Sequence, residues 1–213
     1  MDNFSLSTIV NQFSELKFAF KGVWSADNFL KLSGCASPLF QIINTSVSSE
    51  PGAHWILLCC LPCFDDGGGC SKSNSKINKF YNVVVWNSLD IPFTYFTSFY
   101  ARLQKLYRAK LYVIHEICSN PPVQNKSSNL CGLYCIYSAL ILVKCSKDYS
   151  LNFEQGGAVA AVGGGGGGYS LDKIKQVNCI FRKALQNLHY MNEVDIIRFF
   201  NNKLGSMYTF VIT

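Results

Sequence analysis

The feature that most constrains this fold is the apolar run over residues 136–143, which follows Cys131-Gly132-Leu133-Tyr134-Cys135 without a break. A membrane-spanning helix needs roughly 20 apolar residues, so this run is too short and predicts a helix buried in a protein core. The polar stretch 124–129 (QNKSSN) comes just before it. The helix is therefore expected to begin near Cys131.

Cys131 falls at the expected first turn of that helix. Helix N-termini carry partial positive charge and unpaired N–H groups, which favour a thiolate. The chain has 10 cysteines, however, and buried thiols outnumber catalytic ones. Position alone leaves Cys131 either a nucleophile or a core residue. Several other cysteines lie in apolar stretches: Cys59, Cys60, Cys135, Cys145 and Cys179.

Composition indicates one globular domain spanning residues 1–213. The chain is 49% hydrophobic and 15% charged, which is unlike a disordered protein. No basic segment with a long apolar core opens it, so we expect no signal peptide, an intracellular protein with reduced thiols, and no membrane association. The net charge of +6 is scattered along the chain, so binding to a polyanion such as DNA is allowed but not concluded.

Hydrophobic periodicity and turn residues predict an α+β fold, in which a small mixed sheet packs against helices and the central helix carries Cys131. Strands are expected at 54–60, 80–86 and 111–117, and either a strand or a short helix at 38–44. Helices are expected at 6–16, 96–110, about 171–188 and 192–204, with loop and short structure at 18–24 and 28–32. Flexible insertions are expected at about 65–78 and 155–169, the second being glycine-rich.

A thiol nucleophile needs a base, and the chain has three histidines. His54 opens a predicted buried strand after a Pro-Gly turn, where its side chain could reach a groove. His115 lies in an alternating strand pattern and His189 near a helix end, so both are expected to be structural or exposed. His54 could equally be an ordinary buried histidine.

The third member of such a site orients the histidine. Asn87 ends the predicted strand 80–86 and would lie beside His54 if that strand pairs with 54–60. An asparagine carbonyl can orient an imidazole, as in papain-like sites. Asp90 is the rival for this role because it carries a charge, and Asn87 could also be a simple turn residue.

An oxyanion needs two hydrogen-bond donors. The Cys131 backbone N–H is one candidate, and the side-chain amide of Gln124, seven residues earlier, is the other. Gly132 has no Cβ, which would let a substrate backbone approach closely.

Two other chemistries are not favoured. Cys60 and Cys63, with Cys59 and Cys70 nearby, resemble half of a zinc site, but no second Cys pair or His pair completes four ligands. The glycine tract 163–168 lacks the Lys-Ser/Thr that a phosphate-binding loop requires. No metal and no cofactor is expected.

In combination these residues resemble the adenovirus-type cysteine proteases, within the wider class of ubiquitin-like-protein proteases. The resemblance covers residues 22–145. It rests on four segments in the right order: Gly22-Val23-Trp24, Asn44-Thr45 with His54-Trp55 ten residues on, Val85-Trp86-Asn87-Ser88-Leu89, and Gln124 with Asn129-Leu130-Cys131-Gly132-Leu133-Tyr134-Cys135. The cellular deconjugating enzymes usually have Asp before the cysteine, where this chain has Leu130. Two departures are Asn87 in place of an acid and the glycine-rich insertion.

The resemblance implies a papain-like layout of the ubiquitin-like-protease type and a cysteine endopeptidase with His54, Asn87, Gln124 and Cys131 as its site. It implies viral or virus-like capsid or core precursors as substrates, cut near small Gly-Gly-type residues, in a host nucleus or virion. It also implies an activating peptide and DNA. The three-residue spacing of Arg102, Lys105 and Arg108 predicts a basic helix face, and whether DNA binds there is left open. Cys118 does not lie at the matching distance from Gln124 to be the activating cysteine. A deubiquitinase or deSUMOylase and a catalytically inactive binding module are the alternatives.

Overall fold

A five-stranded mixed sheet forms the centre of the computed structural model, which describes residues 2–33, 38–61, 81–89, 91–108, 112–118, 122–125, 128–154, 181 and 183–204. The strand order is β1-β2-β3-β4-β5. The strands are β1 (Phe20–Ser25), β2 (Leu39–Asn44), β3 (Trp55–Leu61), β4 (Tyr81–Asn87) and β5 (Tyr112–Cys118). The helices are α1 (Asn3–Asn11), α2 (Thr97–Leu106), α3 (Cys131–Glu154) and α5 (Glu193–Leu204), with 3-10 turns η1 (Phe93–Tyr95) and η2 (Gln186–Tyr190).

Strand pairing confirms the α+β prediction and the mixed sheet. β3 pairs antiparallel with both β2 and β4, whereas β1–β2 and β4–β5 are parallel pairs. The predicted pairing of 54–60 with 80–86 is present, with Leu57 opposite Trp86. This register brings the beginning of β3 close to the end of β4. His54 and Asn87 therefore lie at the same end of the sheet.

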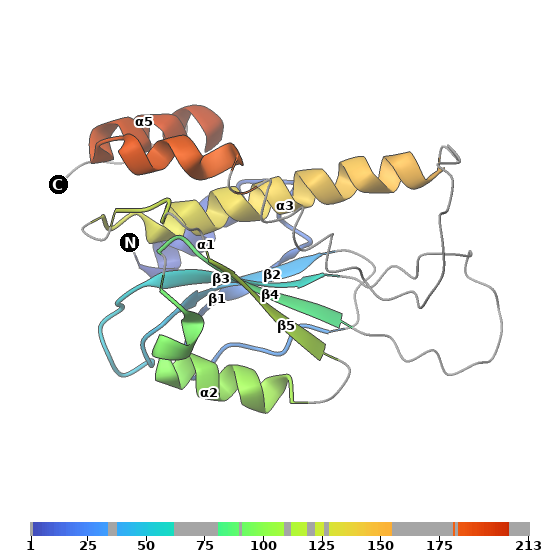
Figure 1. The fold of residues 1–213 in the computed structure, drawn as a ribbon, viewed down its shortest axis with the longest axis vertical. Coiled ribbons are helices and arrows are strands. Elements are labelled where there is room, and N and C mark those ends of the chain that lie inside the picture. The colour runs from blue at the N-terminus through green and yellow to red at the C-terminus, as the bar shows by residue number, and fades with distance from the viewer. Residues whose placement is uncertain are drawn as a thin grey trace.

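Side chains alternate along each strand, so every strand sends residues to both faces of the sheet. Both faces are covered by helices. Leu57 and Cys59 of β3 face the cluster formed with α1, α3 and α5, whereas Ile56 and Leu58 face the cluster formed with α2. Figure 1 shows α3 crossing one face of the sheet and α2 lying on the other. The sequence of a strand that is buried on both faces is a continuous apolar run, and β3 has such a sequence.

The predicted central helix is confirmed as α3, which starts at Cys131. Leu133, Tyr134, Cys135 and Ile136 are all buried in the core cluster that α3 forms with the sheet, α1 and α5. The helix therefore anchors Cys131 through the burial of the apolar turns that follow it.

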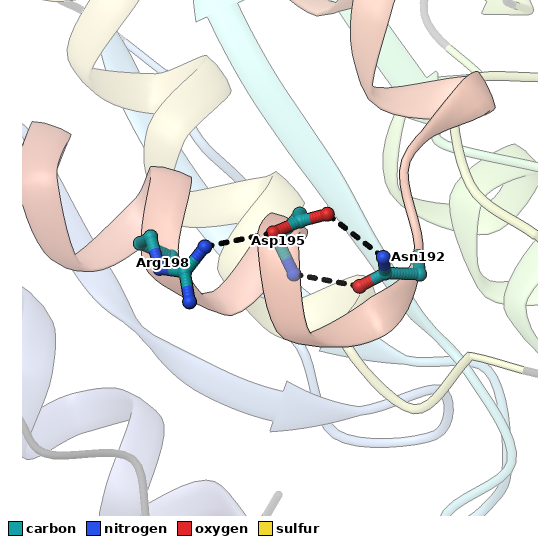
Figure 2. Close-up of polar contacts among 3 residues, drawn as sticks. All are labelled: Asn192, Asp195 and Arg198. Atoms are coloured by element: carbon teal, nitrogen blue, oxygen red, sulfur yellow. Dashed lines mark hydrogen bonds and ion pairs between the residues drawn. The ribbon is translucent and has the colours of Figure 1, made fainter.

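The start of α5 carries a local hydrogen-bonded cap (Figure 2). Asn192 Oδ1 accepts from the Asp195 N–H at 2.9 Å, and Asn192 Nδ2 donates to Asp195 Oδ2 at 2.7 Å. Arg198 lies 2.9 Å from Asp195 Oδ1, but both side chains are largely exposed, so the ion pair adds little. The cap fixes the beginning of α5, which confirms the helix expected over 192–204.

Two predictions at the N-terminal end were wrong. The helix expected over 6–16 ends at Asn11, because the chain then folds into successive turns that still bury Leu16 completely. Burial at helical spacing does not distinguish these turns from a longer helix. The segment expected as loop contains β1, whose strand identity comes from its parallel pairing with β2.

The predicted basic face on 96–110 is also corrected. The helix α2 ends at Leu106, so Arg108 lies beyond it. Arg102 Nε donates to the Phe29 carbonyl at 2.7 Å and its guanidinium lies over the Phe29 ring. Arg102 therefore holds the segment before β2. Since Arg108 lies beyond the helix, the three cations do not share one face of α2.

Several expectations fall outside the described residues. They include both insertions, the segment 171–180 of an expected helix, and the side chains of Asp90, Cys63 and Cys70.

Candidate active site

The structure joins His54 to Asn87. His54 Nε2 and Asn87 Oδ1 lie 2.7 Å apart, and both residues are buried. The Asn87 amide is fixed by its donation to the Ile91 carbonyl at 2.7 Å and by the Leu89 N–H on its oxygen at 3.0 Å. An amide oxygen only accepts, so the proton of His54 sits on Nε2. Nδ1 is left as the basic nitrogen.

The surroundings of His54 keep its imidazole neutral. The ring lies 5.9 Å from the Phe96 ring, and burial lowers the pKa of His54 below its ordinary 6.5, although the hydrogen bond to Asn87 opposes this. Neutral imidazole is the form that can accept a proton at neutral pH.

This burial predicts acid sensitivity of the fold. Because the pKa of His54 is lower in the folded than in the unfolded chain, its contribution to stability is complete above about pH 6.5 and is lost as the pH falls toward the folded pKa. The free energy of unfolding should drop by at most about 1.4 kcal/mol per pH unit in that window. Urea titrations at several pH values measure this slope. His54→Gln should flatten it; an unchanged slope would assign it to other groups, such as His115, whose pKa burial also lowers.

Cys131 begins α3 and is 6% exposed. Burial raises the pKa of its thiol above the ordinary 9.0, while hydrogen bonding from the backbone N–H groups of Trp55 and Gly132 opposes the shift. The N–H groups of Leu133 and Tyr134 donate to the Leu130 carbonyl. The N–H groups of Cys131 and Gly132, in the first turn of the helix, thus point toward the Cys131 sulfur.

Gln124 lies in the short segment before α3 and is 1% exposed. Its Nε2 donates to the Ser128 carbonyl at 2.7 Å, and its Oε1 accepts from the Ser88 hydroxyl at 2.5 Å. A primary amide has two N–H donors, so one remains for another acceptor.

Three of the four residues predicted as a site, His54, Gln124 and Cys131, line one cavity of about 590 Å³. Asn87 does not line it but is hydrogen-bonded to His54. The lining is polar: Asp2, Asn3, Ser25, Asn44, Ser46, Val47, Ser48, Glu50, Gly52, Ala53, His54, Trp55, Leu89, Gln124, Ser128, Asn129 and Cys131. Among these described lining residues the charged ones are acidic, although the chain as a whole is basic. The described lining therefore offers no cationic side chain to a polyanion.

Asn44, at the end of β2, shapes the segment that leads to His54. Its Oδ1 accepts from the N–H groups of Ser46 at 2.9 Å and Ala53 at 3.3 Å, and the Thr45 N–H donates to the His54 carbonyl at 2.8 Å. Gly52 packs so closely that a Cβ there would lie 2.3 Å from Asn44 Nδ2. The Asn44 amide thus ties the residue before His54 to the sheet.

Gly52→Ala should therefore disturb the site. The added methyl group must displace the Asn44 amide, which releases Ala53; we expect a loss of about 1–2 kcal/mol of stability. Thermal denaturation measures this loss. In an Asn44→Ala background the further cost should be below about 0.5 kcal/mol, because the clashing group is gone. Full additivity would contradict this account.

Sequence patterns missed two parts of this arrangement. Asn44 is the last residue of β2, Ser88 directly follows β4, and both are buried. The segments that carry the family resemblance contain both residues, but the sequence patterns assigned neither of them a role. His115, expected to be structural, hydrogen-bonds Asn82 between β4 and β5 and does not line the cavity. The side chain of His189 lies outside the described part of the chain.

Within the described ranges, no group of three or more His, Cys, Asp or Glu side chains is arranged to hold a metal ion. Over the same residues, the helices are too short or too polar to cross a membrane.

Comparison with known proteins gives little guidance. No protein-family model matches the chain, and no curated protein does either. Among solved structures, one described as "AvrA delL154 with IP6, CoA" superposes with a TM-score of 0.38 and 17% identity, over 70% of this chain and 53% of that chain. This chain therefore matches only about half the length of that structure. A match at this level assigns no activity.

Proposed function

We propose that the protein is a cysteine peptidase that uses Cys131 as nucleophile and His54 as general base. The observation that carries the proposal is that His54, which is hydrogen-bonded to Asn87, lines the same cavity as Cys131 at the start of α3. A thiol at a helix N-terminus with a base oriented by a third group is the arrangement that acyl-transfer chemistry requires.

The proposed reaction has the following steps. His54 Nδ1 takes the Cys131 proton as the sulfur attacks a scissile carbonyl. The resulting oxyanion accepts from the Cys131 N–H and the remaining Gln124 N–H. His54 then protonates the leaving amine, and water attacks the acyl-enzyme with His54 again as base. Burial lowers the pKa of His54 and raises that of Cys131, and both shifts favour the neutral forms of the two side chains.

The resemblance to adenovirus-type proteases supplies the finer part of the proposal. It favours precursor proteins of a virus or virus-like element as substrates, cut near small residues, with a peptide or DNA activator and action in a nucleus or virion. Deconjugation of ubiquitin-like proteins is the alternative within the same chemistry. An inactive binding module is the alternative outside it, favoured by the neutral Asn87 in place of an acid.

One experiment separates these alternatives. The full chain is incubated with a peptide that carries a fluorogenic amide after Gly-Gly, and with ubiquitin and SUMO conjugates, with and without DNA. Cleavage of the peptide together with an acyl adduct on Cys131, seen by mass spectrometry, supports the peptidase. Preferential cleavage of the conjugates supports the deconjugating enzyme. Binding of ubiquitin or SUMO with no cleavage and no adduct would sink both enzyme proposals.

A further inference from the structure

Ser88 directly follows Asn87 at the end of β4 and is completely buried. Its hydroxyl donates to Gln124 Oε1 at 2.5 Å. Its backbone carbonyl accepts from the N–H groups of Val123 at 3.1 Å and Gln124 at 3.2 Å. Ser88 therefore holds both the backbone and the side chain of Gln124.

The direction of the Gln124 amide is settled by its other partner. A backbone carbonyl can only accept, so the atom that faces the Ser128 carbonyl at 2.7 Å is Nε2. The opposite atom is then the oxygen, and the Ser88 hydroxyl must donate to it. Without that donor the amide could rotate about its last torsion, which is broad and roughly two-fold.

We propose that Ser88 is the positioning residue of the oxyanion site. It fixes the Gln124 amide so that one Nε2 hydrogen goes to Ser128 and the other is presented to the developing oxyanion beside Cys131. Two consecutive residues then organise the two halves of the site, since Asn87 orients the base and Ser88 orients the donor. This role rests on the proposed peptidase function and extends it to a residue outside the nucleophile, the base and the base-orienting group.

The test separates positioning from simple stability. Removing an oxyanion donor costs about 100–1,000-fold in kcat, so Gln124→Ala should fall in that range. Ser88→Ala should lower kcat by about tenfold with KM within about twofold, because the donor remains but is no longer held. In the Gln124→Ala background, Ser88→Ala should change kcat by less than about twofold, since there is then no amide to position.

A second readout reports the thiol alone. Iodoacetamide alkylation forms no oxyanion, so its rate at Cys131 should be the same in wild type and Ser88→Ala. A peptide aldehyde, whose adduct with the thiol mimics the tetrahedral intermediate, should bind Ser88→Ala about tenfold more weakly, in step with kcat. Ser88→Thr, which keeps the hydroxyl, should restore most of kcat. If Ser88→Ala does not fold, Ser88→Cys replaces it, because a thiol is a poorer donor.

The outcomes are distinct. Equal losses of alkylation and hydrolysis in Ser88→Ala, or full additivity with Gln124→Ala, would overturn the positioning role while leaving the peptidase intact. Failure of the peptidase proposal itself would appear in the wild type, as absence of any acyl adduct on Cys131.

Discussion

Cys131→Ala is expected to lower kcat/KM for peptide hydrolysis by at least about 1,000-fold, because loss of the nucleophile removes the covalent route altogether. The cavity, His54 and the oxyanion donors remain in place, so substrate binding should persist. Initial rates with the fluorogenic Gly-Gly peptide, together with circular dichroism to verify folding, measure this effect.

Cys135 provides the matched control. It lies one turn further along α3, is completely buried, and has a thiol pKa raised well above 9.0 by burial and by the neighbouring thiols. Cys135→Ala should cost about 1 kcal/mol of stability through the small cavity it leaves, yet keep kcat/KM within about twofold. Equal losses in the two variants, or less than about tenfold loss in Cys131→Ala, would remove Cys131 from the nucleophile role.

Asn87→Ala is also expected to lower the rate of hydrolysis strongly. The buried imidazole of His54 would lose the acceptor that fixes its tautomer. The Leu89 N–H would lose the same acceptor, and the Ile91 carbonyl would lose its donor. We expect kcat/KM to fall by about 100-fold, because a wrongly oriented base transfers protons poorly. Steady-state kinetics from pH 5 to 9 give both the loss and the pH limits.

Asn87→Asp distinguishes orientation from charge. It keeps the acceptor but adds a negative charge, which raises the pKa of His54. Activity needs neutral His54, so the acidic limb of the kcat/KM profile should move to higher pH while the maximum stays within about tenfold. Asp90→Asn is the companion variant and should change kcat/KM less than about threefold. A larger loss there than in Asn87→Ala would give the third role to Asp90.

Local patterns predicted much of the framework for a physical reason. The polar stretch before Cys131 and the apolar run after it predict the start of a helix. Buried positions favour apolar residues and exposed positions favour polar ones, so this boundary is visible in the local sequence. The apolar run 54–60 likewise became β3 because it is buried on both faces. The same apolar spacing fits both a helix and a series of turns that bury their apolar residues. For this reason the predicted helix over 6–16 was wrong at its C-terminal end, where the buried Leu16 lies in a turn.

The choice of histidine shows what local patterns leave undecided. His54 and His115 each lie 2.7 Å from an asparagine oxygen, and burial lowers the pKa of both. Their immediate surroundings are thus alike, and only His54 lines the cavity that contains Cys131. Sequence alone predicted that a thiol begins a buried central helix, that His54 opens one strand and that Asn87 ends another. The tertiary structure decided that three segments lie at one cavity: the start of α3, the end of the sheet where β3 begins and β4 ends, and the segment that contains Gln124. Such an arrangement depends on packing between segments that are distant in the chain.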